Sequence, residues 1–352
     1  MRMPFDRRVA CPLILAPLAA VALAGHVQAQ GLIVSGYGDI EWTAEDRGED
    51  GWRNAFDNHH LNLIFLGSIA DDLIVGGEVE YEHAGDLIAL EYAYIGYSGF
   101  KNVRLVGGKF IVPFNRWNKD VHPTWISRMP GRPLTYVNVF PSTYSDVGVW
   151  ASGAFPIGTG SRFVWDGYVV NGLEGDPDAT SFRSLRDNDR ERPRRGNNKA
   201  VGARIGLELA GGLGLGVSGY TGDYAENETT EAGLGISFFG ADADYRYEGL
   251  ELRGEFVSAS QELTTGTDNN NRTGFYAQAA YEVNRFEPVL RYSWVNFEED
   301  DDPGDASELG IGLNYYVGSA AAVRVVYFIN VERTEAFETD NNRLMGQFVV
   351  AF

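Results

Sequence analysis

The sequence contains a single cysteine, Cys11, and it lies in the N-terminal segment. The rest of the chain therefore has no disulfides, zinc thiolate sites or cysteine nucleophiles. No stretch after residue 30 offers about eighteen consecutive apolar residues, so no membrane-spanning helix is expected. Net positive charge is also missing: the formal charge is -20. We expect no nucleic-acid partner, because binding phosphates requires a dense basic surface.

The N-terminal segment has the features of an export signal. Three arginines precede an apolar run at 9–24, and Val27 and Ala29 have the spacing that signal peptidase reads. The run is short and holds two prolines, which favours a signal peptide over a membrane anchor. We expect residues 1–29 to be a secretory signal peptide and residues 30–352 to form the mature domain.

Glycine and aromatic residues are abundant, with 43 Gly, 20 Phe, 18 Tyr and 7 Trp. Only helices and closed barrels satisfy every backbone polar group in lipid. An exported chain that lacks both cysteine and apolar helices therefore has the profile of an outer-membrane β-barrel. The alternative, a soluble acidic secreted protein, is compatible with composition alone.

Alternation of apolar and polar residues supports the barrel. In segment 308–317, Leu309, Ile311, Leu313, Tyr315 and Val317 share one face, and segments 73–82, 250–256 and 323–332 repeat the pattern. Barrel strands alternate in this way between lipid and lumen. We count about sixteen such strands, near residues 32–42, 56–69, 73–83, 88–97, 102–112, 145–155, 161–171, 199–209, 212–223, 231–245, 248–259, 273–284, 286–297, 306–317, 320–333 and 342–352.

The connections between these segments alternate in length. They are short after even strands and mostly long and polar after odd strands, as at 43–55, 113–144, 172–198 and 260–272. Short periplasmic turns and long outer loops are typical of transmembrane barrels, and an even strand count puts both termini on the periplasmic side. The fold class predicted is all-β: a transmembrane antiparallel β-barrel of about 16 strands.

Two strands are hard to assign, and the last strand carries a signal. In the strand at 231–245, Leu234, Ile236 and Phe238 share one face with Asp242 and Asp244. The strand therefore needs a bulge near Gly240 or an earlier end. The face of Lys109 is not assigned. Phe348, Val350 and Phe352 share an outward face at the C-terminus, and a terminal Phe352 resembles the assembly signal of bacterial outer-membrane proteins.

One long segment, 109–143, has little clean period. Between Pro113 and Tyr144 it holds four basic residues, Arg116, Lys119, Arg128 and Arg132, as well as His122, and a single acid, Asp120, which is unusual in so acidic a chain. Loops of this length in a compact protein are uncommon and are usually functional or disordered. We expect the loop at about 113–144 to fold inward and to be the selective element of a channel.

Several stretches of the first half resemble the porin O and P family, which includes phosphate-selective porins. They are EVEYEHAG at 78–85, LEYAYIGY at 90–97, GGKFIVPFNRWN at 107–118, RPLTYVNVFPSTYSDVGVW at 132–150 and YVVNGL at 168–173. The resemblance implies a sixteen-stranded trimeric porin whose third outer loop folds into the lumen. It also implies that basic residues on the loop and wall guide anions, a role that Arg116, Lys119, Arg128 and Arg132 could fill here.

The predicted lumen wall carries both signs of charge, unlike an all-basic ladder. Its predicted members include Glu78, Glu80, Glu82, Arg204, Arg253, Arg291 and Arg324. We expect the loop cations to face Glu78, Glu80 and Glu82 across a narrow gap, shorter than the Debye length of about 8 Å. Such a transverse field would favour small polar or anionic solutes. In the alternative interpretation the cations are solvated or only latch the loop to the wall.

Other polar clusters carry weaker predictions. Six arginines at 183–195 are interleaved with acids, which favours a solvated loop or one that contacts lipopolysaccharide over an anion-gathering vestibule. The acid run at 298–305 lacks the spacing of a calcium-binding hand, which favours a solvated charge run over divalent ions bridging to lipopolysaccharide. His59 and His60 are adjacent, so on a regular strand they point to opposite faces. Neither has a visible partner in the sequence. We expect no metal site, catalytic residue or cofactor.

These patterns together predict a homotrimeric porin of the bacterial outer membrane. It would form a water-filled channel for passive diffusion of small hydrophilic solutes, leaning toward anions such as phosphate, with lipid and lipopolysaccharide as partners. The alternative is a surface-binding or adhesive barrel with a plugged lumen. A third hypothesis, an outer-membrane hydrolase, lacks a serine, histidine and carboxylate pattern in the sequence.

Overall fold

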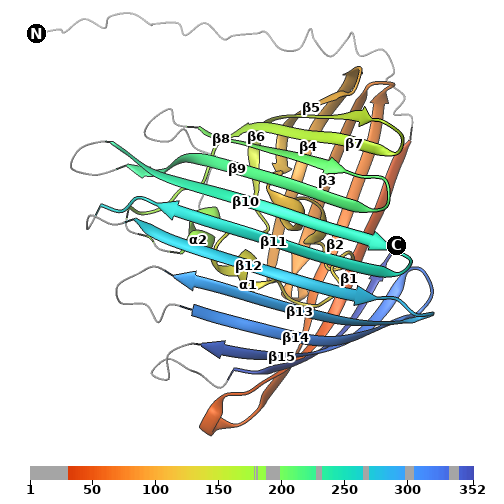
Figure 1. The fold of residues 1–352 in the computed structure, drawn as a ribbon, viewed down its shortest axis with the longest axis vertical. Coiled ribbons are helices and arrows are strands. Elements are labelled where there is room, and N and C mark those ends of the chain that lie inside the picture. Colours follow the sequence, from red (N-terminus) through yellow and green to blue (C-terminus); the bar gives the residue numbers. More distant parts are fainter. Residues whose placement is uncertain are drawn as a thin grey trace, which may run out of the picture.

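A computed structural model describes residues 31–177, 179, 181–187, 199–226, 232–264, 269–297, 305–332 and 341–352. In these ranges sixteen antiparallel strands follow one another around a closed barrel (Figure 1). The predicted fold class is confirmed. The predicted signal peptide at 1–29, most of the acid run and most of the arginine-rich stretch lie outside the described residues.

The strands are β1 (Leu32–Glu45), β2 (Arg53–Ala70), β3 (Leu73–Glu82), β4 (Leu87–Phe100), β5 (Val103–Ile111), β6 (Ser145–Ile157), β7 (Ser161–Val170), β8 (Ala200–Glu208), β9 (Leu213–Glu226), β10 (Gly233–Tyr247), β11 (Leu250–Gln261), β12 (Asn270–Tyr281), β13 (Phe286–Phe297), β14 (Asp305–Tyr316), β15 (Ala321–Glu332) and β16 (Arg343–Ala351). Short helices are α1 (Leu134–Asn138) and α2 (Phe182–Asp187), with single turns at Gly48–Asp50, His83–Gly85 and Trp117–Val121. Within the described ranges, no helix is long and apolar enough to cross a membrane.

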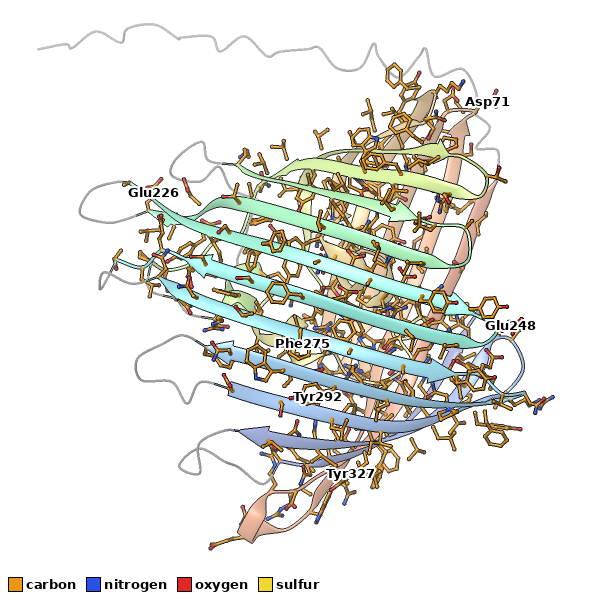
Figure 2. The ribbon with its side chains drawn as sticks, viewed as in Figure 1. Asp71, Glu226, Glu248, Phe275, Tyr292 and Tyr327 are labelled. Atoms are coloured by element: carbon orange, nitrogen blue, oxygen red, sulfur yellow. The ribbon has the colours of Figure 1, made fainter. Side chains whose placement is uncertain are left out.

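The barrel has an apolar outside and a polar inside. Along β8, Val201, Ile205 and Leu207 are exposed, whereas Arg204 is buried. The strands facing the viewer in Figure 2 carry Phe275 and Tyr292 on the same exposed surface. Lipid-facing and lumen-facing residues alternate along the strands of a transmembrane barrel. Because the outward residues are apolar here, the outer face is stable in contact with hydrocarbon.

The last residue helps to close the barrel. Phe352 and Gly36 exchange two backbone hydrogen bonds of 2.9 Å, which extend the ladder between β16 and β1. The rings of Phe348 and Phe352 are exposed on the outer face, as expected. The role of Phe352 as an assembly signal remains a prediction.

Strand β10 corrects one expectation. It runs without a bulge at Gly240, and its only register shift lies at its start, between Leu234 and Gly235. All its residues of even number from 234 to 244 are buried on the inside, first apolar and then acidic. This inner face is apolar from Leu234 to Phe238 because another segment of the chain packs on it.

That segment is the loop between β5 and β6, residues 112–144. Its Asn115 side chain lies against the inner wall at Gly240 and donates a 3.2 Å hydrogen bond to the Phe256 carbonyl of β11. A Cβ at Gly240 would lie 2.4 Å from Asn115 Oδ1, so glycine permits this approach. Figure 1 shows α1, which belongs to the loop, within the barrel outline. The predicted inward-folded third loop is confirmed.

Candidate pore constriction

The neck of the loop is closed by one asparagine. Asn118 Nδ2 donates to the carbonyls of Val112 (2.8 Å) and Tyr144 (3.1 Å), and its Oδ1 accepts from the Tyr144 N–H (2.9 Å). The Val112 N–H also donates to the Tyr144 carbonyl at 2.9 Å. Asn118 is fully buried, so these bonds form away from water. They join the two ends of the loop and fix how it enters the barrel.

Replacing this asparagine is expected to loosen the loop. Asn118→Ala removes three hydrogen bonds, worth about 1 kcal/mol each, so local opening becomes easier by about 3 kcal/mol. Cleavage by trypsin at Lys119 or Arg128, which follows the open population, should accelerate roughly 100-fold. Asn138→Ala, in the same loop, loses one bond of 3.1 Å to the Leu134 carbonyl and serves as the matched control. Equal cleavage of wild type and Asn118→Ala would contradict the role of the neck.

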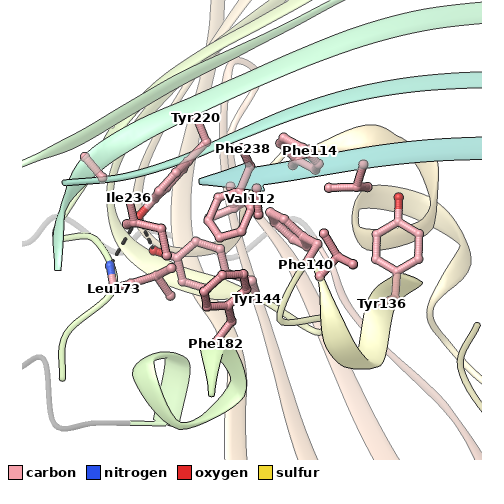
Figure 3. Packing of buried hydrophobic residues seen from close by; sticks show 14 of the residues in the cluster. Val112, Phe114, Tyr136, Phe140, Tyr144, Leu173, Phe182, Tyr220, Ile236 and Phe238 are labelled. Carbon is pink, nitrogen blue, oxygen red and sulfur yellow. Dashed lines mark hydrogen bonds between the residues drawn. The ribbon is translucent and has the colours of Figure 1, made fainter. Parts of the chain in front are cut away.

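An apolar cluster holds one side of the loop against the wall. Phe114 stacks on Phe140 with ring centroids 4.3 Å apart, and Phe140 meets Phe238 of β10 at 5.3 Å. Phe182 of α2 lies against the same Phe238 at 5.6 Å. Figure 3 shows these rings packed together beneath β10 and β11. Burying each phenyl ring contributes about 1.5–3 kcal/mol, so the cluster fixes the loop on the side of β8–β13.

Polar anchors extend this attachment. The hydroxyl of Tyr136 donates to Glu255 of β11, and Tyr276 of β12 donates to the same carboxylate at 2.9 Å. Trp117 lies between Tyr136 and Tyr276, with centroid distances of 5.7 Å to each. The two hydroxyl donors lower the cost of burying this carboxylate. The loop is therefore a fixed part of the lumen.

Two of the predicted cations, Arg116 and Lys119, line an open space beneath the loop. Lys119 Nζ lies 2.7 Å from Asp166 Oδ2 on β7. Arg116 Nε lies 2.5 Å from Asp244 Oδ1 and 3.4 Å from Asp242 Oδ1, both on β10. Each cation therefore both anchors the loop and presents charge to the lumen.

Arg128 is bound more deeply. It donates to the Tyr316 hydroxyl (2.8 Å) and to Glu251 (3.2 Å), and Glu287 lies 3.4 Å away. Burial opposes the charge, but Glu251 and Glu287 outweigh it and raise the pKa of Arg128, so the guanidinium stays ionised. Its position between β11, β13 and β14 favours a latching role.

Arg132 is the one predicted cation on the side of Glu80. It lines a small cavity of about 40 Å³ together with His60 and Glu80, and no carboxylate among the described residues lies within ion-pair distance. Beside it, burial lowers the pKa of His122 to about 3, so that imidazole is neutral at neutral pH.

The expectation that the loop cations face Glu78, Glu80 and Glu82 across a narrow gap is therefore wrong for three of the four cations. Arg116, Lys119 and Arg128 pair with acids of β7, β10, β11 and β13 instead of Glu78, Glu80 and Glu82. The alternation predicted which acids point inward, but the docking side of the loop depends on the apolar cluster. The roles of these four residues at a constriction remain predictions.

The other predicted wall residues form a network of internal pairs. Asn62 donates to both Glu78 (2.7 Å) and Glu80 (3.0 Å), while Glu82 lies 3.7 Å from His60. The four wall arginines also have partners: Arg204 binds Asp242 in bidentate fashion, Arg253 lies 3.1 Å from Glu251, Arg291 lies 3.3 Å from Glu308, and Arg324 donates to the carbonyl of Thr124 and to Gln347. Such mutual pairing lets a wall of mixed charge pack closely.

The open space beneath the loop is a charged cavity of about 660 Å³. A second cavity of about 720 Å³ shares Arg116, Arg162 and Glu208 with it and reaches the turns after β6 and β8. Five basic side chains line the first cavity against three acids: Arg104, Arg116, Lys119, Arg162 and Arg204 against Asp120, Asp166 and Glu208. In a chain of charge -20, this concentration of cations is local.

Arg104 was missed in the sequence. Its guanidinium lies 5.3 Å from the Tyr94 ring centre and 5.8 Å from that of Trp150, and its Nε and one Nη have no hydrogen-bond partner. Lys119 approaches the same Trp150 ring at 5.8 Å. Aromatic faces stabilise cations without neutralising them. Arg104 is two residues from Val106, so on a strand both side chains point to the same face. This spacing is the sequence feature that predicts an inward-facing Arg104.

The two adjacent histidines were interpreted wrongly. Asp39 of β1 pairs with His60 of β2, but Glu41 pairs with Asp57, so β2 has one extra residue at this point. This irregularity brings both imidazoles to the inner side, where each lies near Asp39. A bulge re-aims side chains in this manner, and the prediction of opposite faces assumed a regular strand.

Solved structures with this fold include porins. The anion-selective porin from Comamonas acidovorans is 12% identical, with a TM-score of 0.64 over 92% of this chain and 99% of that chain. OmpF of Salmonella typhi is 16% identical, with a TM-score of 0.65 over 91% and 97%. The trimer form of OmpT, an outer-membrane protein of Vibrio cholerae, is 12% identical, with a TM-score of 0.62 over 92% and 99%.

No protein-family model matches the sequence, and no curated protein sequence is significantly similar to it. At identities of 12–16% the structural likeness shows the fold alone. Membership of the porin O and P family therefore remains a prediction.

Proposed function

We propose that this protein is an outer-membrane porin that lets small hydrophilic solutes diffuse through a water-filled channel. The observation that carries the proposal is the charged cavity of about 660 Å³ beneath an inward-folded loop, inside a closed barrel whose outer face is apolar. A sixteen-stranded barrel leaves an aqueous channel unless it is filled. The loop supplies the filter, because pores select by width and by the charges at their narrowest point.

The channel leans toward anions. Arg104 has no carboxylate partner among the described residues, and basic side chains outnumber acidic ones around the cavity. Charged walls of low dielectric concentrate counter-ions, so an electropositive cavity raises the local concentration of anions. Phosphate is one candidate anion. A neighbour of the same fold is titled an anion-selective porin, which is consistent with this preference.

Assembly and location follow from the same proposal. The apolar belt suits the lipid and lipopolysaccharide of the bacterial outer membrane, where a closed barrel leaves no open sheet edge. We propose a homotrimer, supported by the trimer form in which the OmpT barrel was described.

A second candidate is a barrel with a plugged lumen that binds partners through its long loops. The apolar cluster of the loop, α2 and the inner wall favours it, because that cluster runs along the inner wall from β7 to β13 and includes residues of β5. The two candidates differ in whether solute crosses the barrel.

Liposome swelling separates them. Purified protein reconstituted in liposomes is expected to cause swelling in isotonic arabinose and much slower swelling in a tetrasaccharide, because the loop narrows the lumen. Liposomes with heat-denatured protein are the control. No swelling with arabinose would overturn the porin and favour the plugged barrel.

Arg104 provides a prediction specific to anion preference. A charge about 8 Å from the permeation path contributes about 0.5–1 kcal/mol at dielectric values of about 40–80, so Arg104→Gln should lower the anion-to-cation permeability ratio about two- to fivefold. Arg246→Gln removes the same charge from an exposed residue that lies 3.1 Å from Glu251, and it should change the ratio little. A fall of the ratio in Arg246→Gln alone would contradict the assignment.

A further inference from the structure

A cluster of histidines and carboxylates on the inner wall lies apart from the cationic cavity. Asp39 and Glu41 come from β1, and His59 and His60 come from the irregular part of β2. In the described chain, Asp39, His59 and His60 are a set of metal-ligand types whose donor atoms all lie within 4.8 Å of one another. Because the irregularity turns both imidazoles inward, four potential ligands converge from two paired strands.

The distances suit a tetrahedral metal. His60 Nδ1 lies 2.9 Å from Asp39 Oδ1, His59 Nδ1 lies 3.3 Å from Glu41 Oε2, and His59 Nδ1 lies 3.7 Å from Asp39 Oδ2. Zinc bonds of about 2.0–2.2 Å in a tetrahedral site place the ligand atoms roughly 3.3–3.6 Å apart. The donor atoms are therefore spaced closely enough to bind one ion with small side-chain movements.

Neighbouring groups support the ligands. Gln347 of β16 donates to Asp39 Oδ2 (3.0 Å) and to Glu41 Oε1 (2.7 Å). The other ring nitrogen of His60, Nε2, faces Glu82 at 3.7 Å and Glu80 at 3.8 Å. Metal-ligating histidines usually present their second nitrogen to a carboxylate, and ligating carboxylates are themselves hydrogen-bonded.

His59 shows why the cluster is unfinished without an ion. Its Nδ1 is buried and lies within ion-pair distance of Asp39 and Glu41, but it makes no well-aligned hydrogen bond to either. A buried polar atom with poor hydrogen-bond geometry costs free energy, and a metal ion held between it and the two carboxylates would satisfy all three. The adjoining cavity of about 40 Å³ is large enough for a water ligand.

We propose that Asp39, His59 and His60, with Glu41 as a fourth ligand, bind a transition-metal dication such as Zn²⁺ on the lumen wall. Two imidazoles with carboxylates select borderline metals, whereas Mg²⁺ and Ca²⁺ prefer oxygen ligands alone. Four carboxylates, Asp39, Glu41, Glu80 and Glu82, lie within 4 Å of the two imidazoles and favour a positive ion. Arg132 lines the adjoining cavity, and Arg324 is bound to Gln347.

Calorimetric titration of the purified protein in detergent tests the site. The chain must carry no polyhistidine tag and be stripped with a chelator first. Wild type should bind one Zn²⁺ per chain and prefer it strongly over Mg²⁺ and Ca²⁺. His60→Gln should weaken Zn²⁺ binding by more than about 100-fold and Gln347→Leu by about 10–100-fold, since outer partners contribute that much to metal affinity.

His83→Gln is the matched control. His83 is exposed and lies 2.6 Å from Asp57. It forms a second group of ligand types with Asp57 and His59, but it is not one of the four proposed ligands, so its loss should leave Zn²⁺ binding unchanged. Loss of binding in His83→Gln with retention in His60→Gln would overturn the proposal, and so would no Zn²⁺ binding at millimolar concentration or equal affinity for Mg²⁺.

A second measurement uses wild-type protein only, in case a variant fails to fold. Zn²⁺ should protect His59 and His60 from diethyl pyrocarbonate, as followed by mass spectrometry, and should not change the modification of His83. Equal modification of His59 and His60 with and without Zn²⁺ would also overturn the site. Neither measurement depends on whether the barrel conducts.

Discussion

The Arg116→Gln/Lys119→Gln double variant is expected to lose the anion preference of the channel and to favour cations. Both side chains line the cavity, and each lies against aspartates of the wall. Their removal leaves Asp166 and Asp244 uncompensated, so acids outnumber bases in the space that solutes cross. Two charges at about 8 Å contribute about 1–2 kcal/mol, which predicts a change of roughly tenfold in the permeability ratio.

The matched control for the double variant lies in the same loop. Arg128→Gln also removes a cation, but Arg128 is held by Glu251, Glu287 and Tyr316 and lines neither large cavity. It should reduce stability and leave the reversal potential in a potassium chloride gradient nearly unchanged. If Arg128→Gln shifts the reversal potential and the double variant does not, the cavity beneath the loop is not the selective path.

Replacing residues 116–141 by a short glycine-serine linker is expected to raise single-channel conductance by at least about twofold and to abolish ion preference. The replacement removes Asn118 but is feasible, because the Val112 N–H and the Tyr144 carbonyl are joined directly by a hydrogen bond of 2.9 Å. The change also removes Trp117 and Tyr136 from Tyr276, and Phe140 from Phe238, on the inner wall. We therefore expect a lower thermal unfolding midpoint together with the wider pore.

The same linker inserted after Asp71, in the short turn between β2 and β3, controls for effects on refolding. Figure 2 shows Asp71 at the end of the barrel wall, away from the loop. This insertion should leave conductance unchanged. Unchanged conductance in the loop replacement would mean that the loop does not set the width of the channel.

The barrel itself could be predicted from the sequence, because its strands follow a simple rule. Residues such as Leu309, Ile311 and Leu313 alternate with polar or small residues, and the connections alternate between short and long. The loop was visible because it breaks both the period and the charge of the chain. These signals are local, so one sequence suffices to read them.

Long-range contacts are what the sequence does not specify. From the sequence, the apolar inner residues of β10 resemble residues of a lipid-facing surface. They face the lumen because Phe114 and Phe140 of the loop pack on Phe238. The same packing decides that Lys119 meets Asp166 and not Glu80. Such pairings depend on the side of the lumen to which the loop docks, which no spacing along the chain encodes.

The histidines illustrate a second limit. A bulge in β2 has no characteristic residue type, so the period-two rule placed His59 and His60 on opposite faces. Once the pairing with Asp39 and Glu41 is known, two residues without apparent partners become a potential metal site. Irregular backbone is where sequence reasoning fails and where ligands are often placed.

If the proposed function is right, solutes cross the barrel through a cavity that favours anions. Planar-bilayer recording of the wild-type protein in a tenfold potassium chloride gradient tests this most directly. Stepwise, ohmic conductance is expected, with a reversal potential of the sign that corresponds to chloride passing more readily than potassium. The absence of conductance would contradict the channel, and a reversal potential of the opposite sign would contradict the anion preference.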